Sequence, residues 1–364
     1  MTQQDTTSAH VDGLNPSDPG VTMLAKAVAG QPAREILLVC GGDLPGVGAE
    51  ATRWVLDLRE LSDSRAQAIA VGLDPSRGLD HDFGHAIVWP RSHLGKDFSV
   101  GCLARGALAL RPGGSLWCAV RKNKGAQSLA KEMGALMGEV DVVDRDRGYR
   151  LLQARRTDAF DEAKARQVLE QRYVIEHPLL PGLSLRSAPG VFSRRELDAG
   201  TRVLIEHAAR HGAALTPSRV LDLGCGVGPL ALWAATRFDG ARVLAVDSNL
   251  LAVDLATDNA ARHGLAERVR VLASDGLPAD PSGPVLGMRG RIELALVNPP
   301  THAEPETLGH FSRQLGQWLA PDAVAMLVVS RAGRMTEQLR GAGARVTATE
   351  YERYTVLEAR WPAP

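Results

Sequence analysis

The sequence predicts an α/β protein made of two consecutive domains, each built around a mostly parallel sheet. Short apolar runs alternate with longer helical patterns in both halves of the chain, as expected for repeated strand–helix–strand units. The length of 364 residues exceeds what a single hydrophobic core usually holds, which favours two domains. Both halves also contain a similar step, LRPGGSLWCAV at 110–120 and LAPDAVAMLVV at 319–329, and this repetition suggests a duplication.

The predicted elements follow this alternation. In the first half, the expected elements are strands at 35–42, 67–73, 85–90 and 113–120 and a helix at 101–110. In the second half, they are strands at 219–226, 242–249, 268–276, 292–300 and 323–330 and helices at 229–237, 250–263 and 306–319. Residues 275–291 are rich in Gly and Pro and are expected to form a surface loop.

The domain boundaries follow from the connecting segments. We expect a flexible leader at 1–30, a first domain at 31–174 and a second domain at 175–364. The leader lacks the basic start and the continuous apolar core of a signal peptide. A charged helical stretch at 158–172, followed by HPLLPGL at 177–183, connects the two domains.

Composition limits the classes of function. Lys plus Arg and Asp plus Glu each total 42, so nucleic-acid binding would need a local basic face. The four cysteines have no C-x-x-C spacing, which argues against a disulfide framework and against a metal site; they are Cys40, Cys102, Cys118 and Cys225. No apolar run approaches the roughly 18 residues that cross a bilayer. We therefore expect a cytoplasmic protein, without membrane contact or metal.

A glycine-rich turn is the strongest local signal. The run VLDLGCGVG at 220–228 is a buried strand that leads directly into a turn and then a helix. Gly224, Gly226 and Gly228 give G-x-G-x-G, and Pro229 stands where the dinucleotide-binding pattern has its third glycine. Asp222 precedes the turn, and a carboxylate there suits an ammonium group better than a pyrophosphate.

Carboxylates also follow the next two strands. Asp247 lies about 20 residues beyond the turn, where an acid accepts hydrogen bonds from a ribose diol. Asp275 follows the third strand, in reach of the exocyclic amine of an adenine. S-adenosylmethionine presents an ammonium group, a ribose diol and that amine, so we expect it as the cofactor. The residues expected to bind it are Phe192, Asp222, Gly224, Cys225, Gly226, Gly228, Asp247, Ser248, Asp275, Gly276 and Asn298.

The catalytic motif is Asn298-Pro299-Pro300 at the end of the fourth strand. Two prolines stiffen the loop and remove two amide donors, so the loop presents acceptors. The amide oxygen of Asn298 and the carbonyl of Pro299 can hold both hydrogens of a planar amine and favour the pyramidal geometry in which its lone pair is available. The expected reaction is therefore methyl transfer to such an amine, with no dedicated general base.

A further segment carries a family resemblance. Together with the motifs at 220–228 and 298–300, the segment GVFSRRELDAG at 190–200 resembles the ribosomal RNA guanine-N2 methyltransferases. The resemblance covers most of residues 35–362, including KNKGAQ at 122–127. It implies two tandem Rossmann-like class I methyltransferase domains. The N-terminal one is a degenerate copy that supports the catalytic domain and binds RNA. Its first loop, residues 40–46, lacks the D-x-G-x-G-x-G arrangement.

The resemblance also implies the activity and its substrate. S-adenosylmethionine would donate a methyl group to the exocyclic N2 of a guanine in ribosomal RNA, either naked or in the ribosomal subunit. A monomer is expected. Basic residues that could touch RNA phosphates in the first domain are Arg121, Lys122, Lys124, Arg145, Arg147 and Arg150.

The residues expected to contact the RNA are Arg194, Arg195, Thr301 and His302, while Phe192 and Ser193 frame the cofactor pocket and Asp198 starts a helix. The family usually has an aromatic residue after the two prolines, and this residue stacks on the flipped base. Here the position is Thr301. Because stacking is worth about 1–3 kcal/mol per base, its loss weakens binding or indicates another substrate.

Two other functions stay open at this point. One is methylation of a different planar amine, namely adenine N6 or a protein glutamine. The other is a non-catalytic RNA-binding protein that retains the fold.

Overall fold

The structure, a computed structural model, describes residues 16–40, 42–60, 68–70, 82–91, 94–212, 215–279, 283–299 and 305–362. By their contacts, these residues divide into an N-terminal unit within 10–172 and 188–192 and a C-terminal unit within 173–187 and 193–364. The boundary expected from the sequence, between 174 and 175, lies two residues beyond this division. The short segment 188–192 groups with the N-terminal unit instead of the domain in which we expected it.

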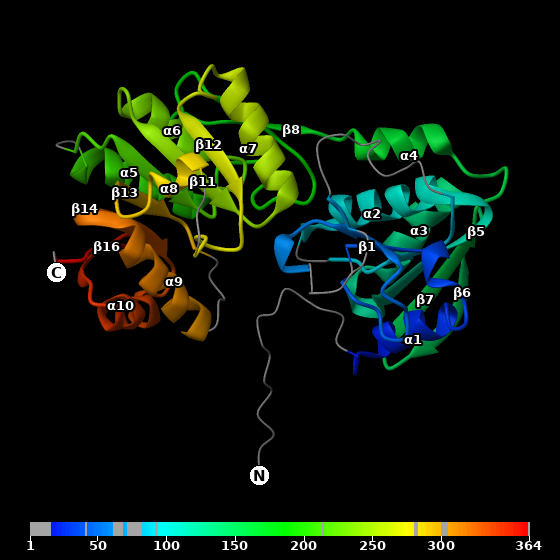
Figure 1. The fold of residues 1–364 in the computed structure, drawn as a ribbon. Helices are drawn as coiled ribbons and strands as arrows, with labels where there is room; N and C mark the ends of the chain where they lie inside the picture. The colour runs from blue at the N-terminus through cyan, green and yellow to red at the C-terminus, as the bar shows by residue number, and fades with distance from the viewer. Residues whose placement is uncertain are drawn as a thin grey trace, which may run out of the picture. The chain divides into compact units, whose positions relative to one another are not determined.

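The N-terminal unit contains a seven-stranded sheet of order β3-β2-β1-β4-β5-β7-β6 (Figure 1). Its strands are β1 (Ile36–Val39), β2 (Thr52–Val55), β3 (Ala68–Ala70), β4 (Phe83–Val88), β5 (Leu110–Arg121), β6 (Asp141–Asp146) and β7 (Tyr149–Arg155). Its helices are α1 (Pro19–Ala27), α2 (Lys96–Ala109), α3 (Ala126–Met137) and α4 (Glu162–Leu169), with short 3-10 turns η1 (Ala33–Glu35), η2 (Leu58–Glu60) and η4 (Lys122–Lys124).

The C-terminal unit repeats this topology, with the order β12-β11-β10-β13-β14-β16-β15. Its strands are β10 (Arg219–Leu223), β11 (Arg242–Asp247), β12 (Val269–Ala273), β13 (Ile292–Val297), β14 (Leu319–Val329), β15 (Arg345–Glu350) and β16 (Thr355–Arg360). Its helices are α5 (Ala199–His211), α6 (Pro229–Arg237), α7 (Leu250–Arg262), α8 (Gly283–Leu286), α9 (Pro305–Trp318) and α10 (Ala332–Gly341). A separate hairpin pairs β8 (Tyr173–Glu176) with β9 (Ser184–Ser187).

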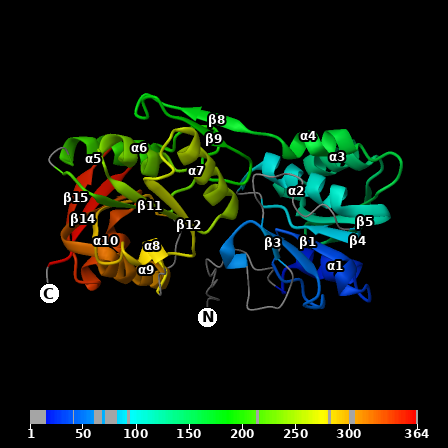
Figure 2. The same cartoon turned by 45° about the horizontal axis from the view of Figure 1, so that its top comes forward.

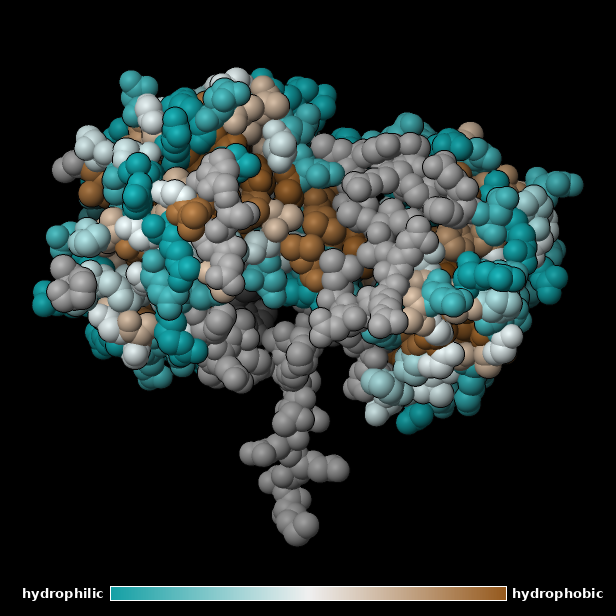
Figure 3. Space-filling model, viewed as in Figure 1, coloured by the Kyte–Doolittle hydropathy of each residue, from teal (hydrophilic) through white to brown (hydrophobic). Residues whose placement is uncertain are grey.

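Helices cover both faces of the C-terminal sheet. Helices α5, α6 and α7 lie on one face, and α8, α9 and α10 lie on the other (Figures 1 and 2). On the face drawn in Figure 3, hydrophilic side chains cover much of the outer surface of each unit. The predicted α/β fold with a mostly parallel sheet in each half is therefore confirmed. Among the described residues, no helix is both long enough and apolar enough to cross a membrane.

The two sheets also agree in local detail. The parallel pairing of β4 with β5 shifts register between Phe83 and His85, and that of β13 with β14 shifts between Ile292 and Leu294. Each shift accompanies the repeated step at the start of the longer strand. In the N-terminal step Gly113 has a φ of 81°, and at the matching position Asp322 has a φ of 62°. At equivalent positions of this step, both units thus have a residue in the left-handed conformation, which supports a duplication.

The expected leader is too long. Residues 19–27 form helix α1, whose side chains Val21, Met23 and Leu24 are buried against the N-terminal sheet. Asp18 caps the helix by accepting a hydrogen bond from Gly20 N at 2.8 Å, and Pro19 occupies the first helical position. We assigned this segment to the leader because it begins with polar residues, although an apolar helical face follows them. Residues 1–15 lie outside the described residues.

Helix α5 is tied to the opposite edge of the C-terminal sheet by a buried histidine. His207 Nδ1 lies 2.8 Å from the hydroxyl of Tyr351, and its Nε2 lies 2.9 Å from Glu358 Oε1. The ring of His211 stacks on it at 4.3 Å. Burial lowers the pKa of His207, an effect that Glu358 opposes. These contacts fix the helix whose first turn contributes to the site described below.

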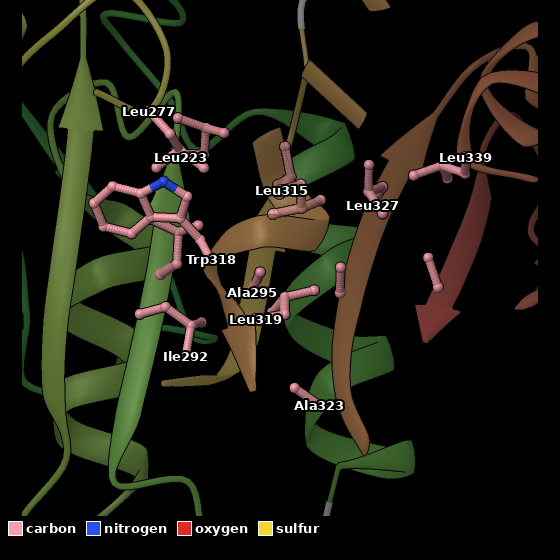
Figure 4. Packing of buried hydrophobic residues seen from close by; sticks show 14 of the residues in the cluster. Leu223, Leu277, Ile292, Ala295, Leu315, Trp318, Leu319, Ala323, Leu327 and Leu339 are labelled. Atoms are coloured by element: carbon pink, nitrogen blue, oxygen red, sulfur yellow. The ribbon is translucent and has the colours of Figure 1, made fainter. Parts of the chain in front are cut away.

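The main core of the C-terminal unit lies between the sheet and helices α9 and α10. Leu315 and Trp318 of α9 project onto strand residues that include Ile292 and Ala295 (Figure 4). Leu315 and Leu339 are completely buried. This packing holds β13, which leads to the catalytic motif, in the middle of the sheet.

Substitution of Leu315 by Ala should lower the free energy of unfolding by about 2–5 kcal/mol, because it leaves a cavity in this core. The matched control is Leu286→Ala, since Leu286 is 58% exposed. The control should change stability by less than about 0.5 kcal/mol. Urea unfolding measures both, and equal losses would contradict the assigned core.

Candidate active site

The parallel strands of the C-terminal unit place the motif residues at one edge. Strand β10 lies between β11 and β13, and Leu223 pairs in register with both Val246 and Val297. The residues that follow these three strands therefore emerge side by side, at the carboxyl ends of the strands, where open α/β sheets bind ligands.

The glycine-rich turn begins directly after β10. Gly224 N and Cys225 N both donate to the carbonyl of Val246, at 2.8 and 3.0 Å. Gly224, Gly226 and Gly228 have φ values of 78°, 54° and 90°. These are left-handed conformations that favour glycine.

Two of these glycines also serve a steric purpose. A Cβ at Gly226 would point into open space, so the loop leaves room beside it. A Cβ at Gly228 would lie 2.9 Å from Leu232, so this glycine permits close packing of α6. Cys225 is buried, and burial raises the pKa of its thiol well above the ordinary value. It is therefore a packing residue and not a nucleophile.

Asp222 is completely buried beneath the turn. Its Oδ2 accepts a hydrogen bond from Ala231 N at 2.8 Å, whereas its Oδ1 is buried without a partner among the described residues. Burial raises the pKa of Asp222 to about 8, and the charge of Asp247 adds to this effect. A buried acceptor without a donor costs free energy, so this atom fits a ligand that brings a donor, above all a cationic one.

Asp247 bridges the ends of two strands. Its Oδ2 accepts from Gly226 N and its Oδ1 accepts from Asn249 N, both at 2.8 Å. The carboxylate thus holds the glycine-rich turn in place, a task that the sequence analysis did not assign to it. The contact of Asp247 with the hydroxyls of a ligand stays a prediction. Ser248 follows Asp247 at the same edge and is half-buried.

The third acid lies farther out. Asp275 is exposed and follows β12, whose end is joined to β11 by a hydrogen bond from Ser274 N to the carbonyl of Asp247 at 3.0 Å. Gly276 has a φ of 74°, which turns the chain after Asp275. The contact of these two residues with a cofactor stays a prediction.

Asn298 follows β13 and is half-buried. Its Nδ2 donates to Asp198 Oδ2 at 2.8 Å and to Thr201 Oγ1 at 3.0 Å. The backbone carbonyl of Asn298 would lie 3.8 Å from a Cβ at Gly224, so Asn298 and the glycine-rich turn are neighbours. Pro299 is buried.

Pro300, Thr301 and His302 lie outside the described residues. Phe192 is 71% exposed and belongs to the segment 188–192 of the N-terminal unit.

The two arginines of the GVFSRRELDAG segment belong to the C-terminal unit. The guanidinium of Arg195 stacks on Tyr173 at 4.5 Å and donates to its hydroxyl at 3.1 Å. Arg194 is half-buried and has interactions of its own within the structure. Binding of RNA by either arginine stays a prediction.

Sequence reasoning missed two contributors to the site. Asp198 was expected to start a helix, and it does cap α5, but it also binds Asn298. Thr201 was not singled out at all. Both contacts span about a hundred positions, so no local spacing indicates them; the only available signal was the L-D-A-G-T run, which includes Gly200.

The N-terminal unit has the same loop without the same chemistry. Cys40 N donates to Trp54 O at 2.8 Å, as Gly224 N does to Val246 O, and Cys40 has a φ of 51°. This equivalence and the strand registers locate the N-terminal positions that match Asp222, Asp247 and Asn298. They are occupied by Leu38, Val55 and Trp89.

A buried ion pair lies at the corresponding edge of the N-terminal sheet. Arg91 follows β4 and pairs with Glu60 at 2.7 Å, with both side chains almost fully buried. Arg91 Nε also donates to the carbonyl of Cys40 at 3.0 Å. Burial raises the pKa of Glu60, and Arg91 opposes this effect. Two protein groups of opposite charge thus meet at this edge, whereas among the described residues Asp222 Oδ1 has no partner.

Comparison with known proteins assigns the family. A family model described as methyltransferase small domain matches residues 182–358. A ribosomal RNA small subunit methyltransferase C of Pseudomonas putida (strain W619) is 30% identical over 339 residues, covering 91% of this chain and 93% of the relative. The chain belongs to the ribosomal RNA small subunit methyltransferase C family. The resemblance found in the sequence is thereby confirmed.

Other members of the family and a solved structure agree. The protein of the same name from Stutzerimonas stutzeri (strain A1501) is 28% identical, covering 92% of this chain and 87% of the relative. The structure of a T. thermophilus 16S rRNA N2 G1207 methyltransferase in complex with AdoMet and guanosine has a TM-score of 0.78 at 24% identity. It covers 95% of this chain and 92% of that chain, so the two-domain class I methyltransferase fold extends over both units.

The raised pKa of Asp222 predicts a pH effect on stability. The folded protein keeps a proton on Asp222 up to about pH 8, whereas the ordinary value of 3.8 applies to the unfolded chain. The contribution of Asp222 to the free energy of unfolding is thus fully present below pH 3.8 and is lost as the pH rises toward 8. The loss amounts to at most about 1.4 kcal/mol per pH unit.

Urea unfolding at a series of pH values checks this expectation. The difference in unfolding free energy between Asp222→Asn and the wild type should grow in favour of the variant as the pH rises. Asp275→Asn removes an exposed carboxylate from the same edge and controls for the change in net charge. A constant difference for Asp222→Asn would mean that the pKa of this acid is the same in the folded and the unfolded chain.

Proposed function

We propose that this protein transfers a methyl group from S-adenosylmethionine to the exocyclic N2 of a guanine in small-subunit ribosomal RNA. The observation that carries the proposal is the arrangement of Asn298, whose amide hydrogens are both bound by protein, beside a turn that lies over Asp222, whose buried Oδ1 has no partner among the described residues. Family membership supports the reaction, and the similar T. thermophilus enzyme was solved with AdoMet and guanosine.

The residues present fit this cofactor. The buried Oδ1 of Asp222 lacks a donor, and an ammonium group supplies one together with a compensating charge. Asp247 places a carboxylate at the turn, where we expect a ribose diol, and Gly226 leaves open space beside the turn. When bound, S-adenosylmethionine supplies a methyl group activated by a sulfonium centre. The protein therefore has to orient the acceptor and stabilise developing charge.

The acceptor amine meets two oxygens. With its nitrogen held by protein, the amide of Asn298 directs Oδ1 away from Asp198 and Thr201. Pro299 lacks an N–H group, so its carbonyl is the polar group that its backbone offers. Two accepted hydrogen bonds draw the amine out of conjugation and direct its lone pair at the methyl carbon.

The bond changes follow from this orientation. The bound cofactor would supply the methyl carbon to the amine nitrogen, and its sulfur would keep the electron pair of the carbon–sulfur bond that breaks. The nitrogen becomes positively charged and loses one proton to water. Partial negative charge on Asn298 Oδ1 and on the Pro299 carbonyl stabilises the developing positive charge.

The N-terminal unit offers a surface for the RNA. Lys122 N donates to the carbonyl of Gly148 at 2.8 Å, which joins the end of β5 to the β6–β7 turn. Two sets of basic residues, within 121–124 and 145–150, therefore share one edge of the N-terminal unit, which we call the basic edge. Its members are Arg121, Lys122, Lys124, Arg145, Arg147 and Arg150. We propose that this edge contacts phosphates, in place of a net positive charge that the chain does not have.

Substitution of Lys122 and Lys124 by Ala should weaken RNA binding and reduce its salt dependence. Each lost phosphate contact lowers the slope of log K against log salt by about 0.7–0.9. The measurement is filter binding of a small-subunit ribosomal RNA transcript at several salt concentrations. Lys131→Ala, on helix α3 of the same unit, is the control, and an unchanged slope in the double variant would place the RNA elsewhere.

The methylation itself is tested in cells. Mass-spectrometric mapping of ribosomal RNA from a deletion strain should show the loss of one N2-methylguanosine, which a plasmid copy of the wild-type chain restores. A plasmid copy of Asn298→Ala should not restore it. An unchanged map in the deletion strain would refute the proposal and favour another planar amine, such as adenine N6 or a protein glutamine.

Purified Asn298→Ala should have lost turnover, because the variant cannot hold the amine. Its affinity for S-adenosylmethionine, measured by calorimetry, should stay close to that of the wild type. Normal cofactor binding by the wild type without turnover on any RNA would instead indicate a binding protein that retains the fold. Equal loss of turnover and cofactor affinity would make Asn298 a structural residue.

A further inference from the structure

Three polar groups form a closed arrangement behind the catalytic amide. Asn298 Nδ2 donates to Asp198 Oδ2 at 2.8 Å and to Thr201 Oγ1 at 3.0 Å. The hydroxyl of Thr201 in turn lies 3.5 Å from the same carboxylate oxygen, as its donor. A primary amide has two N–H groups, so both are used. Among the described residues, no hydrogen bond to Asn298 Oδ1 is found, and this oxygen stays available.

The carboxylate decides which way the amide points. A hydroxyl donates as readily as it accepts, so Thr201 alone would tolerate either orientation of the amide. A carboxylate only accepts. Rotation of the amide by half a turn would bring Asn298 Oδ1 against Asp198 Oδ2, with no hydrogen between the two acceptors.

We propose that Asp198 is a positioning residue for methyl transfer, acting through Asn298. Its charge, with the hydroxyl of Thr201, keeps Nδ2 inward and Oδ1 directed at the target amine. In the reversed orientation Asn298 would present N–H groups to the N–H groups of the amine. The inference rests on the proposed function only for the identity of that amine, since any planar amine needs the same acceptor.

Gly200 is part of the same device. A Cβ at this position would lie 3.0 Å from Asp198 Oδ2 and 3.3 Å from Asn298 Oδ1. Such distances crowd both groups. The glycine thus gives the helix start the space in which the carboxylate and the amide meet.

The positioning role can be separated from the capping role. Asp198 also caps α5 by accepting a hydrogen bond from Thr201 N at 3.0 Å. Asn and Ser cap helices about as well as Asp, but neither has a charge. Asp198→Asn and Asp198→Ser therefore both keep the helix start. Asp198→Ser replaces the acceptor that selects the amide orientation by a hydroxyl, whereas Asp198→Asn removes the charge but keeps an oxygen that can cap the helix and accept from Asn298, as Asp198 Oδ2 does.

Steady-state kinetics on small-subunit ribosomal RNA provides the first test. Asp198→Ser should lose about 10- to 100-fold in kcat, the scale expected for a misoriented catalytic group, and Asp198→Asn should lose less. KM for the RNA and the dissociation constant of S-adenosylmethionine should stay within about twofold of the wild type, as expected when only a transition-state interaction is lost. Thr201→Val should show a smaller loss, and Thr201→Ser, which keeps the hydroxyl, should restore activity.

A matched control uses another helix cap. Asp161 caps α4 by accepting from Lys164 N at 2.9 Å, in the N-terminal unit. Asp161→Asn and Asp161→Ser should leave kcat unchanged. Wild-type kcat in both Asp198 variants would overturn the proposal, because the side chain would then serve only as a cap. Loss of folding or of cofactor affinity in parallel with kcat would overturn it as well.

A second readout does not depend on activity. In ¹⁵N-labelled protein, the side-chain amide signals of Asn298 are those that disappear in Asn298→Asp. Their hydrogens should exchange slowly with solvent in the wild type and faster in Asp198→Ser. Equal exchange would refute the positioning role. A slow, Asp198-dependent exchange in a protein that methylates no guanine would refute the proposed substrate and leave the positioning role intact.

Discussion

The parallel pairing of β10 with β11 and β13 is the constraint on which the site depends. Register between these strands places the glycine-rich turn, Asp247 and Asn298 side by side, although they are distant in the chain. Helix packing then fixes β13 through the core around Trp318. The buried His207 holds α5 against strand β16 through Glu358. Strand register therefore brings the site residues together, and contacts between their side chains then orient them.

The sequence was sufficient for the fold and for those residues that lie next to glycines and prolines. Helix α6 begins and ends as predicted, because a left-handed Gly228 and Pro229 mark its start. The contact of Asp198 with Asn298 could not be predicted, since it joins the cap of one helix to a loop a hundred positions away. Helix α1 was missed because its apolar face is short and follows a polar leader. Thr301, which stands where the family usually has an aromatic residue, lies outside the described residues.

The two units show how one topology diverges by exchanging a few buried groups. Equivalent turns begin with Cys40 and Gly224, both in the left-handed region. In one unit Glu60 and Arg91 neutralise one another within the protein, and in the other Asp222 has an oxygen with no protein donor. Loss of cofactor binding by the N-terminal copy thus needs no change in the order of its strands.

The buried Oδ1 of Asp222, which has no partner among the described residues, has a consequence for the stability of the protein in the cell. A ligand that binds only the folded state stabilises it by an amount that grows with the logarithm of the ratio of its concentration to the dissociation constant. The C-terminal unit is therefore least stable when its cofactor is scarce, whereas the buried pair of Glu60 and Arg91 in the N-terminal unit needs no ligand. Turnover of the enzyme by proteases would then follow the metabolic state of methyl-group donors, without any separate sensor.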